Sequence, residues 1–333
     1  MKVCVTGANG FIGANLVRAL LKKKASVRAL VRSTSDLRLL KGLDVELVFG
    51  DLRDKISLQK AFQDCDVLYH TAALYAFWVK DPACFYDVNV QGTQNVLEAA
   101  GEMGVSKIVY TSTVGTIRCP KDPATPSDEN SFAEEGEMET DYKRSKFLAE
   151  QTVLKFVKKG LPVVIVNPSA PIGPYDGKPT PTGRIIVDFL RRSLPLYVNT
   201  GLNIVDVEDV AAGHILAAEK GKIGERYILG NKNISLKEIY EIIGEQVHRK
   251  SPPLRIPYGL AFLAALGSEG VAYWKNTPPA VSLGAVQMAK RYMYFSPAKA
   301  IRELGLPQSP IESAFEKAIG WFQSNGYLNG SHP

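Results

Sequence analysis

The chain has 333 residues, of which 45% are hydrophobic and 22% are charged, and its formal net charge is +6. This composition excludes a disordered chain, a collagen-like repeat and a small disulfide-stapled domain. The sequence contains no apolar run of about 18 residues that would predict an integral membrane segment. The excess of 40 basic over 34 acidic residues is modest and scattered, so no nucleic-acid partner is predicted.

Short β-branched runs alternate with helical patterns over the first half of the chain. Strands are predicted at 2–6, 26–31, 45–49, 67–70, 107–111 and 163–167, and helices at 11–24, around 88–97 and at 141–158. Strands that alternate with helices of this length form right-handed βαβ units. The predicted fold class is therefore α/β, a Rossmann-type doubly wound parallel sheet with helices on both faces.

The pattern changes after residue 167. A loop rich in Pro and Gly is expected at 168–183, followed by helices at 207–219, 235–248, 279–290, 297–304 and 311–325 and a strand at 226–229. We predict a dinucleotide-binding domain at 1–167, with further sheet contributions near 203–230, and a smaller, mainly helical substrate-binding part at 168–330. The apolar segment 260–266 is interpreted as a packed helix, and contact with a membrane or lipid is left open.

The four cysteines, Cys4, Cys65, Cys84 and Cys119, form no C-x-x-C pair. The sequence therefore predicts neither a metal site nor a redox motif. The first six residues have the pattern of a strand and not of a signal peptide, so a cytoplasmic location is expected.

The strongest motif is the glycine pattern Gly7, Gly10 and Gly13, which lies between the first strand and the first helix. The amides at a helix N-terminus bind an anion, and glycine lets the backbone approach a phosphate closely. The strand–turn–helix context is the one that such a phosphate-binding loop requires.

Two further groups of residues indicate proton-transfer chemistry. Tyr142 and Lys146 are four residues apart and share one face of a helix, where a lysine favours phenolate and lowers the tyrosine pKa. The hydroxyls of Thr111, Ser112 and Thr113 cluster where the fifth strand ends, the edge at which ligands bind in parallel sheets. These hydroxyls can contact a substrate carbonyl or cap the loop.

The glycine loop, the hydroxyl cluster and the Tyr–Lys pair follow one another along the chain in the order and spacing of a known family. The chain resembles an extended short-chain dehydrogenase/reductase of the dihydroflavonol 4-reductase-like branch. Its segments 178–190 and 224–230 are similar to those of bacterial hopanoid-associated sugar epimerase proteins, which belong to the NAD-dependent epimerase/dehydratase family. The resemblance implies that the dinucleotide is bound by residues of the glycine loop and of several strand ends: Gly7, Asn9, Gly10, Phe11, Ile12, Gly13, Arg32, Asp51, Leu52, Thr71, Ala72, Ala73, Thr111, Ser112, Tyr142, Lys146, Asn167, Pro168 and Ser169.

The resemblance also implies a catalytic triad of Thr113, Tyr142 and Lys146. Most relatives carry serine in place of Thr113, whose side chain is stiffer at χ1. The chain also departs from the family pattern at Asp206, where relatives commonly carry histidine. The Asp-Glu pair of the related 4,6-dehydratases is absent, because Val114 and Gly115 follow Thr113.

Three functions are consistent with these residues. The first is an NADP(H)-dependent reductase that converts a ketone or aldehyde to an alcohol, with Tyr142 as proton donor. The second is an NAD-dependent nucleotide-sugar epimerase, and the third is a non-catalytic dinucleotide-sensing protein. Arg32 ends the second strand, where an arginine accommodates the 2′-phosphate of NADP(H), so NADP(H) is the expected cofactor, with NAD(H) left open.

The expected partner is a small-molecule carbonyl or sugar substrate, and a homodimer is left open. Candidate substrate-binding segments are 75–84, 116–131 and 175–203. Tyr75, Phe77 and Trp78 of the first segment form either an apolar wall of the pocket or part of the core.

Overall fold

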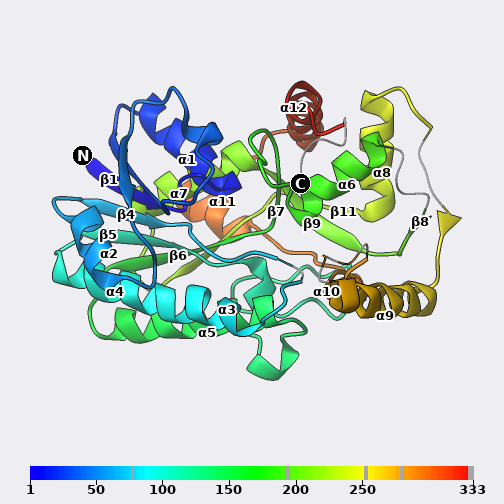
Figure 1. Ribbon diagram of the computed structural model, residues 1–333, viewed down its shortest axis with the longest axis horizontal. Helices are drawn as coiled ribbons and strands as arrows, with labels where there is room; N and C mark the ends of the chain where they lie inside the picture. Colours follow the sequence, from blue (N-terminus) through cyan, green and yellow to red (C-terminus); the bar gives the residue numbers. More distant parts are fainter. Residues whose placement is uncertain are drawn as a thin grey trace.

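The computed structural model describes residues 1–76, 78–191, 196–250, 254–275, 277, 279 and 281–328. Its centre is a seven-stranded parallel sheet of order β10-β6-β5-β4-β1-β2-β3 (Figure 1). The strand order reverses between β1 and β4, which places a crevice at the carboxyl ends of these two strands. The strands are β1 (Lys2–Thr6), β2 (Ser26–Val31), β3 (Glu46–Phe49), β4 (Val67–His70), β5 (Lys107–Thr111), β6 (Val163–Pro168) and β10 (Arg226–Leu229).

Both faces of the sheet are covered because alternate strand residues point to opposite sides. Val3 and Val5 of β1 pack in one core with α1 (Phe11–Lys22), α7 (Val207–Lys220) and α11 (Ala298–Leu304). Cys4 and Cys65 lie in the other core, together with α2 (Lys55–Phe62), α4 (Gly92–Glu102) and α5 (Asp141–Lys158). Figure 1 shows these two groups of helices on opposite sides of the sheet. The predicted doubly wound α/β fold is confirmed.

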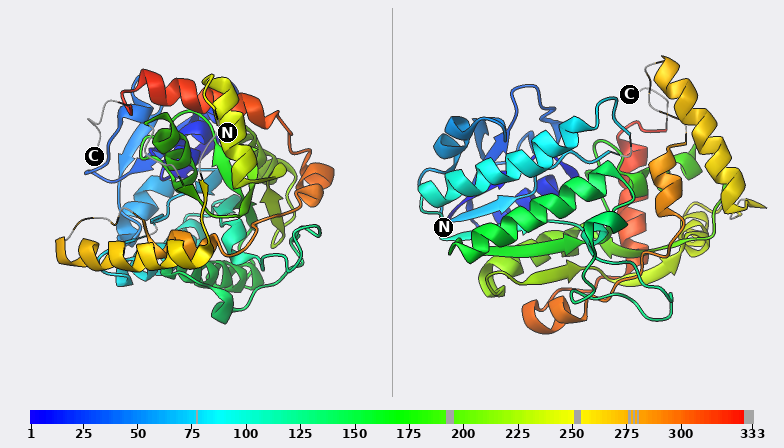
Figure 2. Two further views of the ribbon diagram at one scale, coloured as in Figure 1. Left: turned by 90° about the vertical axis from the view of Figure 1, so that its right-hand side faces the viewer. Right: turned by 90° about the horizontal axis from the view of Figure 1, so that it is seen from below.

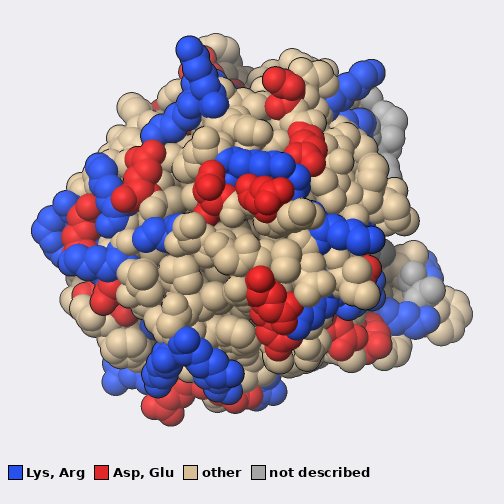
Figure 3. Space-filling view, turned by 90° about the vertical axis from the view of Figure 1, so that its left-hand side faces the viewer, with Lys and Arg blue, Asp and Glu red and all other residues tan. Residues whose placement is uncertain are grey.

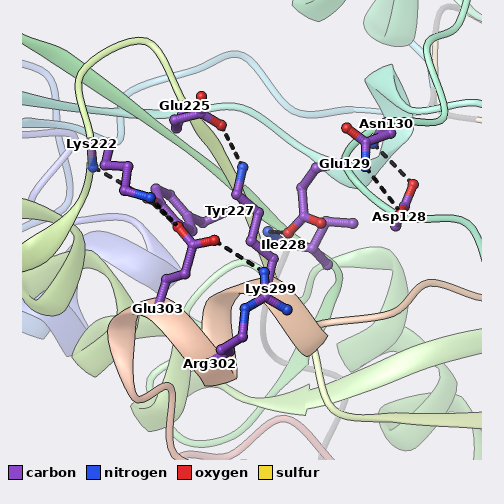
Figure 4. Close-up of polar contacts among 10 residues, drawn as sticks. All are labelled: Asp128, Glu129, Asn130, Lys222, Glu225, Tyr227, Ile228, Lys299, Arg302 and Glu303. Carbon is purple, nitrogen blue, oxygen red and sulfur yellow. Dashed lines mark hydrogen bonds and ion pairs between the residues drawn. The ribbon is translucent and has the colours of Figure 1, made fainter.

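The edge strand β10 is shielded by polar contacts from two distant segments (Figure 4). Glu129 accepts a hydrogen bond from the Ile228 amide at 2.8 Å. On the other side, Lys299 of α11 contacts Glu225 at 2.6 Å, and the Tyr227 hydroxyl donates to Glu303 at 3.3 Å. These contacts fix α11 against β10 and cover an edge that could otherwise pair with another chain.

The C-terminal part contains a second sheet that the sequence pattern does not reveal. Its order is β11-β9-β7, with β9 parallel to β7 and antiparallel to β11. The predicted loop at 168–183 therefore contains a short strand and the start of a helix. The elements are β7 (Ala170–Ile172), β9 (Gly201–Asp206), β11 (Lys232–Ser235), α6 (Pro181–Leu190), α8 (Leu236–Gln246) and α12 (Ile311–Ser324), which share one apolar core.

A peripheral unit lies at the edge of this part, as the two views of Figure 2 show. It consists of β8 (Leu196–Tyr197), β12 (Leu254–Arg255), α9 (Tyr258–Lys275) and α10 (Leu283–Met288), while the short α3 (Ala83–Tyr86) precedes α4. The predicted helix at 260–266 is thus part of α9. In the described residues no helix is both long and apolar enough to cross a bilayer.

The opposite end of the molecule carries charges of both signs. Figure 3 shows Lys and Arg side chains interspersed with Asp and Glu on the face at the left of Figure 1. On the face that Figure 3 shows, basic and acidic side chains therefore lie among one another and do not form a large patch of one sign.

Candidate active site

A cavity of about 850 Å³ lies beyond the carboxyl ends of the central strands. Most of the predicted cofactor residues line it: Gly7, Asn9, Gly10, Phe11, Ile12, Gly13, Arg32, Thr71, Ala73, Thr111, Ser112, Tyr142, Lys146, Pro168 and Ser169. Thr113 also lines it. The structure thus brings the glycine loop and the predicted triad into one cavity.

The glycine loop has the backbone geometry that a phosphate cradle requires. Gly7 has a φ of +66°, and a Cβ there would lie 2.7 Å from the Ala72 Cα atom. A Cβ at Gly13 would lie 2.2 Å from the Gly7 carbonyl oxygen. Gly10 is the N-cap of α1, and among the described residues no side chain caps its amides. The N-terminus of α1 is therefore open to an anion at the wall of the cavity.

Charged side chains gather where β2 and β3 end. Asp36 pairs with Arg38 at 2.7 Å, and Asp51 pairs with Arg53 at 2.8 Å. Hydrogen bonds from Arg53 lower the pKa of Asp51 to about 2. Arg32 lies at the cavity wall and has no carboxylate within 4 Å among the described residues. The two aspartates are thus engaged by their own arginines, while Arg32 is available to a ligand.

Four predicted cofactor residues lie outside the cavity lining. Asp51 is bound to Arg53, and Leu52 packs between the helices α2 and α4 while its carbonyl accepts from Asn95 at 2.9 Å. Ala72 lies behind Gly7, and its amide donates to the Thr6 hydroxyl. Asn167 is fully buried beneath the hydroxyl cluster. Their contact with a cofactor stays a prediction.

Tyr142 lies in the first turn of α5, whose N-cap Thr140 accepts from the Lys143 amide at 3.2 Å. Its ring lies 4.7 Å from that of Tyr75 and 6.3 Å from that of Phe85. Burial raises the pKa of Tyr142 above its ordinary value, and a hydrogen bond with Thr113 offsets part of this rise. The two predicted catalytic hydroxyl residues, Tyr142 and Thr113, thus line the same cavity. Phe77, for which the sequence leaves a pocket wall and the core as alternatives, lies outside the described residues.

Lys146 lies one turn further along α5 and is almost completely buried. Its Nζ donates to the Thr111 carbonyl at 2.8 Å and to the Tyr110 hydroxyl at 3.0 Å. Burial lowers the pKa of Lys146 to about 7, although Glu150 raises it. Lys146 is thus directed at Tyr110 and Thr111, while burial raises the pKa of Tyr142; that Lys146 lowers the pKa of Tyr142 stays a prediction.

Glu150 is a site residue that the sequence reasoning missed. Its buried carboxylate accepts hydrogen bonds from Ser112, from Thr116 at 3.0 Å and from Asn167 at 3.1 Å. It also pairs with Arg226 of β10 at 2.7 Å. Glu150 thereby connects α5 to the ends of β5 and β6. Its spacing of four residues after Lys146 is the signal that could have indicated it.

The loop after β7 supplies Asp176, which belongs to the candidate substrate-binding segment 175–203 but which the sequence did not single out. Its carboxylate lines the cavity and accepts from the Thr180 amide at 2.8 Å and from the Thr180 hydroxyl at 2.8 Å. Burial raises the pKa of Asp176 to about 7. A Cβ at Gly183 would lie 2.0 Å from Asp176 Oδ2, so the glycine is needed for this packing. The preceding Tyr175 has a φ of +70° and stacks on Arg18 at 3.7 Å.

The lining that the C-terminal part contributes is mixed: Asp176 and Lys178 are charged, and the residues after them are apolar or carry uncharged polar groups. Every described lining residue after position 178 is uncharged. On the α5 side, Lys143 is paired with Glu139 at 2.8 Å. The principal apolar lining residues are Leu74, Val114, Ile185, Leu202, Met288 and Met293.

Asp206, the second departure from the family pattern, lies outside the cavity lining. It caps α7 by accepting from the Glu208 amide at 2.8 Å, and it pairs with Lys317 at 2.8 Å. Its role in this structure is therefore to hold α12 against α7. In the described part of the chain no cluster of three metal-ligating side chains is present.

The residues present fit a nicotinamide dinucleotide. The cradle at Gly7 and Gly13 leaves room for a phosphate that a Cβ would exclude, and the α1 amides face it. Further along the cavity, the buried Ser169 hydroxyl lacks a hydrogen-bond partner among the described residues. Such an unsatisfied polar atom at a cavity wall is a contact point for a ligand.

Fold and site together define an NAD(P)-dependent oxidoreductase of the extended short-chain dehydrogenase/reductase type. The model of the NAD dependent epimerase/dehydratase family matches residues 3–230. The chain belongs to this family, as the sequence motifs predicted.

Similar proteins carry reductase and sterol-related names. A protein of Synechocystis sp. named as a dihydroflavonol 4-reductase is 45% identical over 97% of this chain and 95% of its own. Sterol demethylase protein B of Methylococcus capsulatus is 35% identical over 98% of this chain and 100% of its own. The crystal structure of gox2253 has 42% identity and a TM-score of 0.88 over 98% of this chain and 99% of its own.

Proposed function

We propose that the protein reduces an apolar ketone or aldehyde to the alcohol with NADPH as hydride donor. The observation that carries this proposal is the uncharged lining after position 178, in which Ile185, Leu202, Met288 and Met293 supply apolar surface to the same cavity that Tyr142 and Thr113 line. A nucleotide-sugar needs cations for its phosphates, whereas an apolar carbonyl compound needs apolar walls and one or two oriented hydroxyls. The sterol in the name of the Methylococcus relative is an apolar molecule of this kind.

In the proposed reaction the bound dinucleotide supplies the hydride. The Thr113 hydroxyl orients the substrate oxygen by a hydrogen bond, and the Tyr142 hydroxyl donates the proton to the same oxygen. Since burial keeps the Tyr142 phenol protonated in this structure, the residue is in the state that reduction requires. Lys146 is held in place by Thr111 and Tyr110 and is proposed to hold the nicotinamide ribose.

The Tyr142→Phe variant tests the proton-transfer role. It should bind NADPH as the wild type does and lose roughly 10²–10⁴-fold in turnover, because only the hydroxyl is removed. The measurement is the change in nicotinamide absorbance on a substrate found by screening apolar ketones and aldehydes. Turnover of the Phe variant close to that of the wild type would contradict the role.

The cofactor preference is proposed from Arg32. Its guanidinium is unpaired among the described residues, whereas the neighbouring Asp36 is engaged by Arg38 and so is a poor partner for a ribose diol. A guanidinium–phosphate pair contributes about 1.5–3 kcal/mol, or roughly tenfold to a hundredfold in affinity. We therefore expect tighter binding of NADPH than of NADH.

The direct test is titration of both cofactors into the wild type and two arginine variants. Arg32→Ala should weaken NADPH by roughly tenfold to a hundredfold and leave NADH nearly unchanged. Arg302→Ala is the matched control, because Arg302 lies on α11, outside the cavity lining, and pairs with Glu303. Equal affinity of the wild type for NADPH and NADH would contradict the preference.

The competing function is an NAD-dependent nucleotide-sugar epimerase, which the family description favours. Incubation with nucleotide-sugars and NAD, followed by separation of the epimers, distinguishes the two. Epimerisation without net consumption of NADPH would replace the reductase proposal, and cofactor binding without any turnover would favour the dinucleotide-sensing function. The cytoplasmic location, the homodimer and the domain boundary at residue 167 stay predictions.

A further inference from the structure

Helix α9 exposes a concentration of large apolar side chains. Leu260, Leu263, Val271 and Trp274 are 59%, 65%, 52% and 85% exposed. Their spacing of three, eight and three residues places them on one side of the helix. A Cβ at Gly267, on the same side, would meet no atom within 4 Å. This side of α9 is therefore an open apolar surface, which we call the α9 face.

The opposite side of α9 holds the helix to the protein. Ala261 and Ala265 are buried and pack in one cluster with Val286 of α10. The Glu269 carboxylate accepts a hydrogen bond from the Leu283 amide at 2.7 Å, which ties the two helices together. The helix is thus anchored through its small residues while its large apolar residues point outward.

The chain segments that flank α9 carry more basic than acidic residues, although Glu139 and Asp141 also line the cavity beside the helix and Glu139 pairs with Arg291 at 3.8 Å. Between residues 249 and 291 the sequence has six basic residues and one acidic residue, Glu269, which is engaged with α10. The basic residues are Arg249, Lys250, Arg255, Lys275, Lys290 and Arg291, and all six are exposed. Arg255 and Lys275 lie at the two ends of the helix. Within α9 only Glu269 and Lys275 are charged, so the cations flank the helix, and exposed Leu and Trp side chains with cations nearby suit the surface of an anionic bilayer.

Helix α9 also borders a cavity that reaches the reaction site. A second cavity of about 400 Å³ is lined by Glu269 and Tyr273 of α9, by Trp78 and Phe85, and by Tyr142. The α9 face therefore lies beside a cavity that reaches the proposed proton donor. In Figure 2 the helix lies at the periphery of the molecule, where a flat surface can approach it.

We propose that α9 is a docking helix that binds the surface of an anionic lipid bilayer, with the α9 face inserted among the acyl chains and the flanking basic residues on the headgroups. A second copy of the chain is the less suitable occupant, because a two-fold interface through α9 would bring two equally basic surfaces together. If the protein reduces an apolar carbonyl compound, as proposed above, a docked α9 would allow this substrate to pass from the bilayer to Tyr142.

The test is flotation of the full-length protein with vesicles, without cofactor or substrate, so that its outcome is independent of the proposed reduction. We expect binding to vesicles of phosphatidylcholine and phosphatidylglycerol, weaker binding to phosphatidylcholine alone, and a decrease at high salt. A variant with Leu260→Ser, Leu263→Ser and Trp274→Ser should bind at least tenfold more weakly. These side chains are exposed, and unchanged circular dichroism and melting temperature verify the fold of the variant.

The matched control is Ile56→Ser with Phe132→Ser, two side chains that are 64% and 63% exposed on other parts of the molecule. This control should bind vesicles like the wild type. Failure of the wild type to bind anionic vesicles, or equal binding by the α9 variant, overturns the proposal. A wild-type dimer in gel filtration that the α9 variant converts to a monomer also overturns it, because the α9 face is then a self-association surface.

Discussion

Replacement of Glu150 by glutamine should destabilise the protein strongly although it changes the side-chain volume little. Glu150 is 1% exposed and pairs with Arg226, which is 9% exposed. The Glu150→Gln variant leaves the Arg226 guanidinium buried without a counter-charge. Removal of one partner of a buried ion pair costs about 3–5 kcal/mol in the free energy of unfolding. This is a large fraction of the roughly 5–15 kcal/mol that stabilises a typical domain.

Urea unfolding followed by circular dichroism measures this loss. The double variant Glu150→Gln with Arg226→Met removes both charges and should recover much of it, because a buried pair can be replaced by apolar groups at little cost. Glu102→Gln is the surface control, since its pair with Lys55 is exposed and the variant should unfold like the wild type.

A second measurement separates the electrostatic role of Glu150 from its structural role. Glu150 raises the pKa of Lys146, so the Gln variant should lower this pKa further below about 7. A pH profile of cofactor binding by the soluble variant reports this shift. A loss of less than about 1 kcal/mol in Glu150→Gln, or a double variant no more stable than the single one, would refute the argument.

Three other predictions follow from the same geometry. Thr113→Ser should retain turnover, whereas Thr113→Val should lose roughly 10²–10³-fold in turnover. If Thr113→Val is active and Ser112→Ala is inactive, Ser112 and not Thr113 supplies the hydroxyl that bonds the substrate oxygen. Lys146 has a pKa of about 7 when folded and near 10.5 when unfolded, so the unfolded state binds more protons between these values. The unfolding free energy of the wild type should therefore rise relative to Lys146→Met from pH 7 to pH 10, by at most about 1.4 kcal/mol per pH unit; a constant difference would contradict the shift. For Asp176 the sign is opposite, because its pKa of about 7 in the folded state exceeds the value of 3.8 in the unfolded state. As the pH rises from about 4 to 7, the free energy of unfolding of the wild type, measured by urea titration, should therefore fall relative to that of Asp176→Asn.

The sequence by itself determined the parts of the protein that depend on short-range patterns. The period of the apolar residues predicts the central strands, such as Lys2–Thr6, and the long helix Asp141–Lys158. The glycine loop is recognisable because Gly7 needs a positive φ and Gly13 a close backbone approach, which no other residue allows. The helical spacing of Tyr142 and Lys146 likewise places both in one cavity.

The tertiary structure decided what depends on distant neighbours. Strand β9 pairs with β7 and β11, so its existence rests on partners about 30 residues away on either side and not on its own alternation. Burial raises the pKa of Tyr142, and the Lys146 ammonium donates to Tyr110 and Thr111, contacts that the helical spacing does not reveal. Glu150 gains its role from Arg226 on another strand, and the leucines of α9 are exposed because no element covers them among the described residues. Composition predicts that a side chain is apolar or charged, but only the packing of remote segments decides what surrounds it.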